Sequence, residues 1–395
     1  MGYRLPIYKE NSSLKRQHYL DRIKKAFKTH KIVALLGPRQ CGKTTLAKDY
    51  IAFQQKAFEE KNYFDLEKNT DIARLANPQL SLEPLQGLIV IDEIQRIREL
   101  FPTIRVLVDH VKDQHYLILG SASRDLIHQS SETLAGRIQF IETTPFSYEE
   151  TDHINRLWLR GGFPLSYLAD NDEESFIWRR EYTQTFLERD IPNLGIQIPA
   201  TQLRRFWMML AHYHGNIFNA SEIGNALSLN HKTIRHYADI LNGTFMIREI
   251  QPWFENISKR QIKSSKIYFR DSGILHFLLN IPDELNLLHH PKLGASWEGF
   301  ALESIIRHHE ATEGEYYFWG TLAHAELDLL IIKNGRRLGF EFKYTDKPKI
   351  TKSMTIALED LNLDKLYVIF PGKNHFLLSK DIEVFGLENY LSSLP

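Results

Sequence analysis

The stretch from Lys31 to Lys48 constrains the fold most strongly. An apolar run over residues 32–36 leads into the pattern G-x-x-x-x-G-K-T, which opens a helical stretch. Gly37 and Gly42 permit backbone conformations that are closed to residues with a Cβ atom, so successive N–H groups can converge on an anion. A loop of this kind between a strand and a helix is typical of a site for nucleotide phosphates.

The side chains of this loop have separate expected roles. Lys43 is expected to reach the β and γ oxygens of the nucleotide, and Thr44 to offer its hydroxyl to Mg²⁺. The rest of the loop is expected to surround the phosphates. The residues predicted to bind the nucleotide are Gly37, Pro38, Arg39, Gln40, Cys41, Gly42, Lys43, Thr44 and Thr45.

A second apolar run, over residues 88–91, ends in two acids, Asp92 and Glu93. An acid pair in this position is often only the cap of a following helix. Downstream of a complete phosphate loop, we interpret Asp92 as the residue that holds Mg²⁺ through water and Glu93 as the residue that polarises the attacking water. ATP and Mg²⁺ are therefore the expected cofactors.

The composition fits an enzyme with several domains. The chain has 395 residues, of which 43% are hydrophobic, enough for two or three cores. Lys plus Arg and Asp plus Glu both number 49, so no global basic field indicates a nucleic-acid partner. Cys41 is the single cysteine, which excludes an intrachain disulfide and is compatible with a reducing compartment.

Targeting and metal signals are weak. The first ten residues lack an apolar core with a cleavage site, and no window of the sequence is long and apolar enough to span a bilayer. We therefore expect a cytoplasmic protein without a membrane partner. The 17 histidines are scattered, and the pairs His289–His290 and His308–His309 are interpreted as solvated surface instead of zinc ligands.

Apolar strand candidates alternate with helical patterns in the first third of the chain, which predicts a parallel sheet covered on both faces. After Pro145 the pattern turns helical up to Pro199, which we interpret as a lid on the nucleotide domain. The strand candidates cover residues 32–36, 63–66, 88–91, 116–119 and 138–141.

Two helical patterns, at residues 219–229 and 231–241, resemble a helix-turn-helix, and residues 245–250 are a candidate wing strand. Within residues 231–270, Lys and Arg number eight and Asp and Glu three, a local excess of about +5. Lys232, Arg235 and His236 are the candidate contacts to DNA phosphates. Modules of this kind also serve as docking or lid elements, so this alternative stays open.

The first motifs resemble AAA-type ATPases, and in particular a bacterial and archaeal family that carries a C-terminal domain of unknown function. The phosphate loop and the stretch Ile91-Asp-Glu-Ile-Gln-Arg96 carry this resemblance. Further matches cover most of the chain: residues 120–123, 134–137, 160–164, 187–190 and 266–273.

This resemblance implies roles for four more residues. Ser121 is expected to sense the γ-phosphate, with Ser123 as the second choice, although many AAA proteins have Asn or Thr there. Arg137 corresponds to an arginine finger that reaches a neighbouring subunit, which implies a homo-oligomer such as a ring or hexamer. Its alternative is a charge at the end of a helix. Arg189 is a weaker candidate for sensing nucleotide from the lid.

The last hundred residues resemble the PD-(D/E)xK nuclease fold. Residues 297–303 are expected to start a helix, and residues 325–332 and 338–343 to form strands. Glu341 and Lys343, two positions apart on a strand, share a face that Asp328 is expected to approach, so Asp328 and Glu341 are a possible second metal site for Mg²⁺ or Mn²⁺. The remaining acid of the nuclease pattern is Glu298 or Glu303. The strand is alternatively only an amphipathic edge.

Together these features predict an α/β protein with four parts: a P-loop AAA-type parallel sheet (1–145), a helical lid (146–200), a winged-helix-like module (201–256) and a nuclease-like α/β domain (257–395). The leading hypothesis is an ATPase that remodels nucleic acid, with DNA favoured over RNA and branched or duplex DNA as substrate. The alternatives are a nucleotide-dependent switch that docks a protein partner and an ATP-gated, metal-dependent nuclease.

Overall fold

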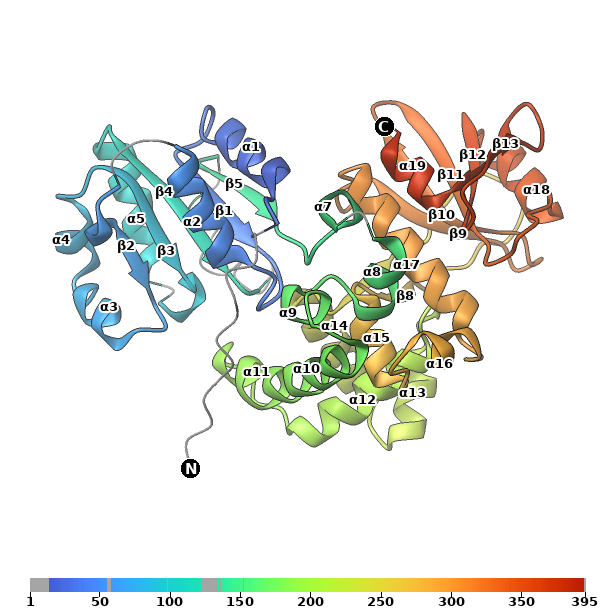
Figure 1. Cartoon of the computed structure of the whole chain (residues 1–395), viewed down its shortest axis with the longest axis horizontal. Helices are drawn as coiled ribbons and strands as arrows, with labels where there is room; N and C mark the ends of the chain where they lie inside the picture. The colour runs from blue at the N-terminus through green and yellow to red at the C-terminus, as the bar shows by residue number, and fades with distance from the viewer. Residues whose placement is uncertain are drawn as a thin grey trace.

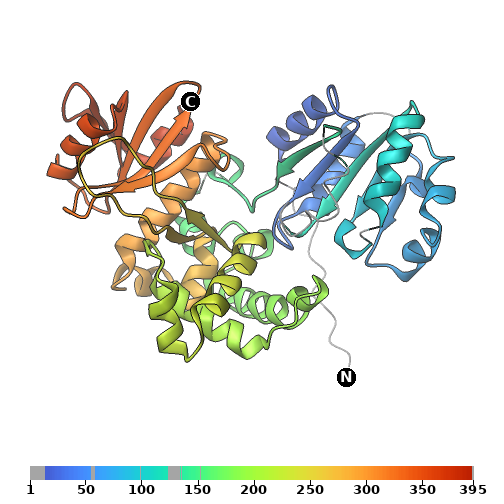
Figure 2. The ribbon, with the colours of Figure 1, turned by 180° about the vertical axis from the view of Figure 1, so that it is seen from behind.

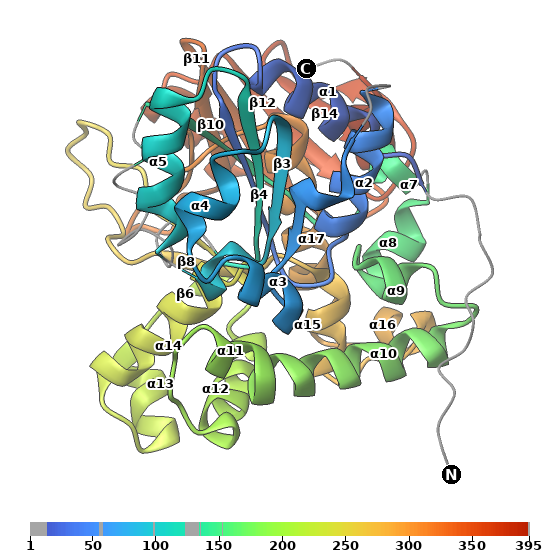
Figure 3. The same cartoon turned by 90° about the vertical axis from the view of Figure 1, so that its left-hand side faces the viewer.

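The structure is a computed structural model that describes residues 14–54, 58–97, 99–122, 134, 136–151 and 153–393. It has two parts: an N-terminal domain of residues 14–142, at the left of Figure 1, and a C-terminal body of residues 146–393, at the right. The same division is seen from behind in Figure 2, and in Figure 3 the N-terminal domain faces the viewer in front of the C-terminal sheet. None of the described helices is long and apolar enough to cross a membrane.

The N-terminal domain contains a five-stranded sheet in the order β2-β3-β4-β1-β5, and all neighbouring strands are parallel. The five predicted strands are therefore confirmed. The elements are α1 (Gln17–Ala26), β1 (Ile32–Leu36), α2 (Lys43–Phe53), η1 (Glu60–Asn62), β2 (Tyr63–Asp65), α3 (Asn69–Arg74), α4 (Pro78–Leu82), β3 (Gly87–Asp92), η2 (Ile94–Arg96), α5 (Leu100–His110), β4 (Gln114–Gly120) and β5 (Ile138–Glu142).

Both faces of this sheet are buried, as predicted. Along β1, Val33 and Leu35 pack with the apolar residues of α1 and α2. Ile32 and Ala34 point to the opposite face and pack with those of α4 and α5. The loop after β1 and the acid pair at the end of β3 consequently meet at the carboxyl edge of the sheet, where α/β folds bind ligands.

The first half of the C-terminal body is mainly helical and includes a three-stranded antiparallel sheet in the order β6-β8-β7. Strand β8 belongs to this sheet although it comes after residue 256. The elements are α7 (Tyr148–Thr151), α8 (Ile154–Arg160), α9 (Pro164–Tyr167), α10 (Asp172–Thr185), the π-helix η4 (Phe186–Asp190), α11 (Ile191–Asn193), α12 (Ala200–His212), β6 (Asn216–Ile217), α13 (Ala220–Leu227), α14 (His231–Gly243), β7 (Ile247–Ile250), β8 (Lys266–Phe269), α15 (Ser272–Leu278) and α16 (Glu284–Leu288).

The second half is a six-stranded mixed sheet in the order β13-β14-β12-β11-β10-β9, in which β9, β10 and β11 are antiparallel and β11, β12 and β14 parallel. Helix α17 contacts β11, and α18 contacts β10, β11 and β12. The elements are α17 (Leu293–His308), β9 (Tyr316–Gly320), β10 (Glu326–Lys333), β11 (Arg336–Phe342), α18 (Lys352–Asp360), β12 (Lys365–Phe370), β13 (His375–Leu377), β14 (Ile382–Gly386) and α19 (Leu387–Ser392). Residues 297–303 thus lie inside α17 and do not start it.

The helices expected as a lid do not form a separate layer. Their buried side chains, such as Trp158 and Phe186, belong to one core with Trp207 of α12 and Phe300 of α17. That core includes neither the nucleotide-domain sheet nor the face of the six-stranded sheet that packs on α18, which has a core of its own. These helices contact the phosphate loop through Tyr182 and Asp190, but their buried side chains pack in the C-terminal body.

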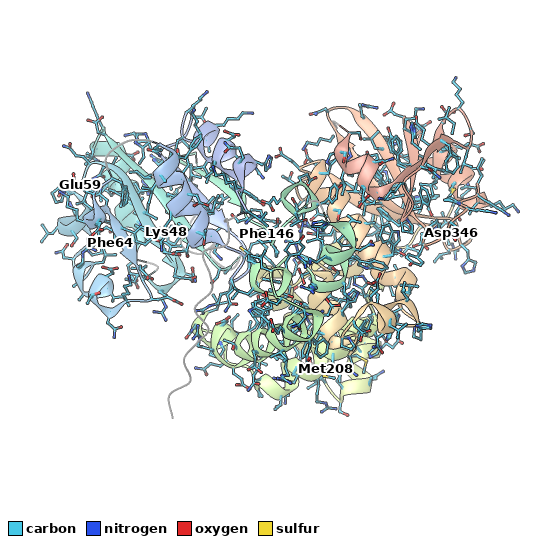
Figure 4. All side chains as sticks on the ribbon, viewed as in Figure 1. Lys48, Glu59, Phe64, Phe146, Met208 and Asp346 are labelled. Atoms are coloured by element: carbon cyan, nitrogen blue, oxygen red, sulfur yellow. The ribbon has the colours of Figure 1, made fainter. Side chains whose placement is uncertain are left out.

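The junction between the two parts contains buried polar contacts. Figure 4 labels Phe146 there, beside the end of the N-terminal domain, and its N–H donates to Gly162 O at 2.7 Å. The guanidinium of Arg16 donates to Glu150 Oε1 of α7 at 2.6 Å and to Cys41 O of the loop at 3.2 Å. A single arginine therefore links the loop after β1 to the C-terminal body.

Candidate nucleotide-binding site

The loop between β1 and α2 has the backbone that the glycines predict, for two different reasons. Gly42 has φ 94° and Gln40 φ 61°, both in the left-handed region. Gly37 does not have a positive φ, but a Cβ atom there would lie 1.9 Å from Thr143 O. The expectation that Gly37 serves through conformational freedom was therefore wrong, because lack of space is what requires glycine at this position.

Lys43 lies across this loop. Its side chain is buried, and Nζ donates to Gly37 O at 3.0 Å and to Pro38 O at 2.9 Å. The N–H groups of the first turn of α2, which starts at Lys43, have no partner within the helix. The loop thus combines a fixed ammonium with a helix N-terminus, a combination that favours phosphate.

Thr44 and Asp92 meet at the carboxyl edge of the sheet. Thr44 Oγ1 donates to Asp92 Oδ2 at 2.7 Å, and the Tyr63 hydroxyl donates to the same oxygen at 3.2 Å. Asp92 is 4% exposed, and its Oδ1 is buried without a hydrogen-bond partner. Burial, with a contribution from nearby Glu93, raises the pKa of Asp92. A hydroxyl and an unpartnered carboxylate oxygen fit Mg²⁺, which prefers oxygen ligands.

Glu93 has φ 58°, an uncommon conformation for a residue with a side chain. Its Oε2 accepts hydrogen bonds from Gln95 Nε2 and, at 3.2 Å, from Ser121 Oγ at the end of β4. Gln95 Nε2 also contacts Ser121 Oγ at 2.8 Å. The predicted water-polarising and γ-phosphate-sensing residues are therefore in direct contact. Ser123 lies outside the described residues.

Gln95 was not predicted as a site residue, although it stands two positions after Glu93 in the motif of residues 91–96.

Glu67 and Asp190 were not predicted either, because they are distant in sequence from the phosphate loop. Arg39 Nη1 donates to Asp190 Oδ1 of the π-helix at 2.6 Å, and Arg39 Nη2 donates to Glu67. Arg189 is exposed and lies 3.6 Å from Asp190. Arg39 therefore points to these acids in the structure.

A small pocket adjoins these side chains. Arg39, Glu93 and Ser121 of the N-terminal domain line one side of it. The C-terminal body supplies the other side, through Phe186 and Asp190 of the π-helix, Asn193, Leu194 and Thr244. The body of the same chain thus covers the side of the site that carries Glu93.

Arg137 lies at the opposite end of the sheet, immediately before β5. Its Nε and Nη2 donate to Asp109 Oδ1 and Oδ2 of α5 at 2.8 and 2.9 Å. The two side chains are 37% and 40% exposed. Because β5 is parallel to β1, its amino end is remote from the phosphate loop of the same chain. Arg137 is thus placed away from its own nucleotide site and is held by an acid.

Two curated relatives cover nearly the whole chain. The uncharacterized proteins Mb2031c of Mycobacterium bovis and Rv2008c of Mycobacterium tuberculosis are each 45% identical over 383 residues, which is 96% of this chain and 85% of the relative. The chain belongs to the family of these two proteins.

Family models divide the chain into three matched segments. Residues 29–151 match an AAA domain, residues 151–285 a domain of unknown function (DUF8612), and residues 293–390 another domain of unknown function (DUF4143). The protein is thus a P-loop ATPase of the AAA type with a C-terminal domain of unknown function, as the resemblance implied. The Walker-type ATPase PABY2304 of Pyrococcus abyssi is structurally similar over 70% of this chain and 98% of its own, with a TM-score of 0.48 and 13% identity.

The three predicted DNA contacts lie on α14, in the segment that matches the first domain of unknown function. Lys232 and His236 are exposed. Arg235 instead donates to Glu249 Oε1 of β7 at 2.8 Å and to Asp239 at 2.8 Å. Because its guanidinium is bound to two acids of the protein, Arg235 is less available to phosphates than Lys232 and His236.

The basic excess of residues 231–270 is mostly neutralised within the protein. Besides Arg235, the cations of this window that form ion pairs include Arg248 with Glu303 at 2.7 Å and Lys259 with Asp360 at 2.6 Å. Lys266 pairs with Glu326, and Arg270 with Glu142 and Glu303. The acids that pair with these four cations lie outside residues 231–270, so a count of charges within this segment overestimated the basic surface.

The nuclease-like residues gather between β8, α17 and the strands β10 and β11. Lys343 Nζ lies 2.7 Å from Glu341 Oε2 and 3.7 Å from Asp328 Oδ2. Burial and the charge of Asp328 raise the pKa of Glu298 to about 7 and that of Glu341 to about 8. Glu298, Asp328, Glu341 and Lys343 are thus brought together, as predicted.

Two features of this cluster were not expected. Glu303 lies elsewhere, bound by the guanidinium groups of Arg248, Arg270 and Arg307, so Glu298 is the acid that joins the cluster. Lys266 of β8 adds a second buried ammonium, and Glu298 and Asp328 raise its pKa to about 12 although burial opposes this. Within the part of the chain that the structure describes, no group of three or more His, Cys, Asp or Glu side chains is arranged to hold a metal. The expected metal site at Asp328 and Glu341 requires only two carboxylates and stays a prediction.

Proposed function

We propose that this protein hydrolyses ATP and uses the cycle of binding and hydrolysis to remodel nucleic acid, with branched or duplex DNA as the substrate. The observation that carries the ATPase half is the contact between Thr44 and Asp92. In this contact Asp92 uses Oδ2, and its Oδ1 is buried without a hydrogen-bond partner.

The residues of the site have separable roles. Thr44 and Asp92 would hold Mg²⁺, which when bound neutralises charge on the phosphate oxygens. Lys43 binds the phosphates, and Glu93 orients the attacking water and accepts its proton. Ser121 and Gln95 orient the carboxylate of Glu93, because both donate hydrogen bonds to it and also contact each other.

The order of elements in residues 200–269 supports the nucleic-acid half of the proposal. A helix, a short strand, two helices and two strands follow one another, and the strands pair in the order β6-β8-β7. This arrangement is typical of winged-helix modules, in which the helix corresponding to α14 faces DNA. Lys232 and His236 are exposed on that helix, which suits contacts to phosphates.

A ring remains part of this proposal through Arg137. Its side chain is 37% exposed and lies remote from the nucleotide site of its own chain, which suits a finger acting on a neighbour. Mixing Arg137→Ala subunits with Glu93→Gln subunits tests this role. Recovered turnover is expected if the arginine acts between subunits, and turnover equal to the sum of the two separate variants would contradict it.

A second candidate is a nucleotide-dependent switch that docks a protein partner. The observation that favours it is the pairing of the cations in residues 231–270 with internal acids, which leaves less positive surface for nucleic acid. In this case ATP hydrolysis is slow and indifferent to nucleic acid.

Steady-state ATP hydrolysis separates the two candidates. It is measured without nucleic acid, then with single-stranded DNA, duplex DNA, a four-way junction and RNA, with Lys43→Ala as the blank. Stimulation by duplex or junction DNA supports the remodelling ATPase, whereas hydrolysis above the blank without any response supports the switch. The DNA strands are recovered on a denaturing gel, so that cutting lost in Asp328→Ala would instead establish a nuclease.

A further inference from the structure

Besides the link through Arg16 and Glu150, the C-terminal body contacts the phosphate loop at the side chain and the main-chain oxygen of Arg39. Asp190, which is 7% exposed, binds the guanidinium of Arg39 at 2.6 Å. The hydroxyl of Tyr182, on the preceding helix α10, donates to Arg39 O at 3.4 Å. Both groups come from the helices expected as a lid, and both act on the same residue of the loop.

The electrostatics of this contact depend on a few neighbouring charges. Burial is the main cause that raises the pKa of Asp190, and the charge of Glu93 adds to it, whereas Arg39 and Arg189 oppose it. The guanidinium of Arg39 therefore offsets part of the cost of burying the Asp190 carboxylate. Glu93 lies within the same electrostatic surroundings, so the contact is part of the nucleotide site.

Phe245 forms a second contact between the C-terminal body and the N-terminal domain. Phe245 lies two residues after the end of α14 and has φ 64°, at a position where helices usually have glycine. Its N–H donates to Asn242 O, and the next N–H, of Met246, donates to Leu241 O, the bonds of a Schellman motif. The ring of Phe245 is 8% exposed and belongs to the core of the N-terminal domain. A strained bulky residue here has a packing role between the two parts.

We propose that Asp190 and the phosphates of ATP compete for Arg39, so that binding of ATP releases the π-helix from the phosphate loop and loosens the docking of the C-terminal body. This inference rests on the proposed function, because it requires nucleotide at the loop. A bound phosphate places several negative charges within reach of a loop arginine, and guanidinium groups bind phosphate as readily as carboxylate. Asp190 is then a buried carboxylate without its cationic partner, which is unfavourable, and the segment 186–194 opens.

Hydrogen exchange measured by mass spectrometry tests this release. The full-length protein is compared without nucleotide and with a non-hydrolysable ATP analogue and Mg²⁺. We expect exchange of the amides in residues 37–45 to slow, which reports binding, and exchange in residues 186–194 to become about tenfold faster, because a buried ion pair is lost. Asp190→Asn is expected to show the fast exchange of residues 186–194 without nucleotide.

Two variants serve as controls. Glu188→Gln removes a charge from the same π-helix, but Glu188 is exposed and bonds only Gln184 among the described contacts; it is expected to behave as the wild type. Asp190→Glu retains the carboxylate and is expected to restore slow exchange, which excludes simple misfolding as the cause.

Exchange in the two segments distinguishes a failure of the competition for Arg39 from a failure of nucleotide binding. Slowed exchange in residues 37–45 with unchanged exchange in residues 186–194 would overturn the competition and leave nucleotide binding intact. Equal effects of Glu188→Gln and Asp190→Asn would also overturn it, because the charge on Arg39 would then not be the cause. Unchanged exchange in residues 37–45 would contradict nucleotide binding itself, and the inference would fall with it.

Discussion

Thr44 Oγ1 donates a hydrogen bond to Asp92 Oδ2 at 2.7 Å and so joins the phosphate loop to the end of β3. The two residues are 48 positions apart, but parallel strands bring them to one edge of the sheet. The other oxygen of Asp92 is buried and has no partner. This pair is therefore the place where a divalent cation would be held.

Asp92→Asn is expected to weaken ATP binding in the presence of Mg²⁺ by about 10- to 100-fold, because a hydrogen bond or ligand bond to a charged group is worth about 1.5–3 kcal/mol. Binding in the presence of EDTA should change little. Calorimetric titration measures both conditions. Thr44→Ser, which keeps the hydroxyl, is the matched control, and unchanged Mg²⁺-dependent affinity in Asp92→Asn would contradict this assignment.

Phe245→Gly separates local backbone strain from docking between the two parts. Glycine relieves the left-handed conformation, which costs a residue with a side chain about 1–2 kcal/mol, but it removes a buried ring worth about 3 kcal/mol or more. We expect weaker docking, seen as faster proteolysis in residues 143–147 at unchanged helix content. Slower proteolysis in this variant would show that the ring does not hold the two parts together.

Lys232→Ala is expected to weaken DNA binding and to reduce the salt dependence of the affinity by about one ion. Arg235→Ala should leave that salt dependence unchanged and lower the melting temperature, because Glu249 and Asp239 lose their partner. Fluorescence anisotropy with labelled duplex at several salt concentrations measures the slope. Lys380→Ala, at an exposed lysine between β13 and β14, is the control, and equal slopes for Lys232→Ala and Lys380→Ala would remove α14 from the interface.

His276 predicts how stability depends on acid pH. Burial lowers the pKa of His276 from 6.5 to about 3, while its ring bonds Ser296 Oγ at 2.6 Å and Leu159 O at 2.9 Å. Between these two pH values the unfolded chain binds the proton and the native protein does not, so stability falls as pH falls, by about 1.4 kcal/mol per pH unit for this group.

Urea unfolding of the wild type and of His276→Gln between pH 7 and pH 4 measures this contribution. The variant should be less stable at pH 7 and should have a shallower loss of stability on the acid side. His289→Gln, at an exposed position immediately after α16, should keep the slope of the wild type. An identical slope in all three proteins would show that His276 is protonated in the folded state.

The nucleotide site could be predicted from the sequence because its residues lie next to each other along the chain. The loop from Gly37 to Thr45 is continuous, and Asp92 and Glu93 end a strand whose neighbours are parallel. The parallel arrangement alone then brings the two stretches together. The π-helix partner of Arg39 could not be predicted, since Asp190 stands 151 positions away on an element that no local pattern links to the loop.

The charged residues outside the site were predicted less well. Arg235 and Glu303 each belong to a pattern that suggests contact with a ligand, but ion pairs with the protein bind both. Their partners, Glu249 and Arg248, lie on β7, whose position depends on the three-stranded sheet. Charge counted along a sequence does not reveal which charges neutralise each other in the folded protein.

Turnover by Glu93→Gln tests the central claim most directly. The amide keeps the size of the side chain but cannot accept a proton from water, so hydrolysis is expected to fall by about 10²- to 10⁴-fold while ATP binds as in the wild type. Phosphate release and equilibrium ATP binding are measured on the same preparation, with the exposed Glu83→Gln as control. Normal ATP binding together with wild-type turnover in Glu93→Gln would contradict the mechanism assigned to this site.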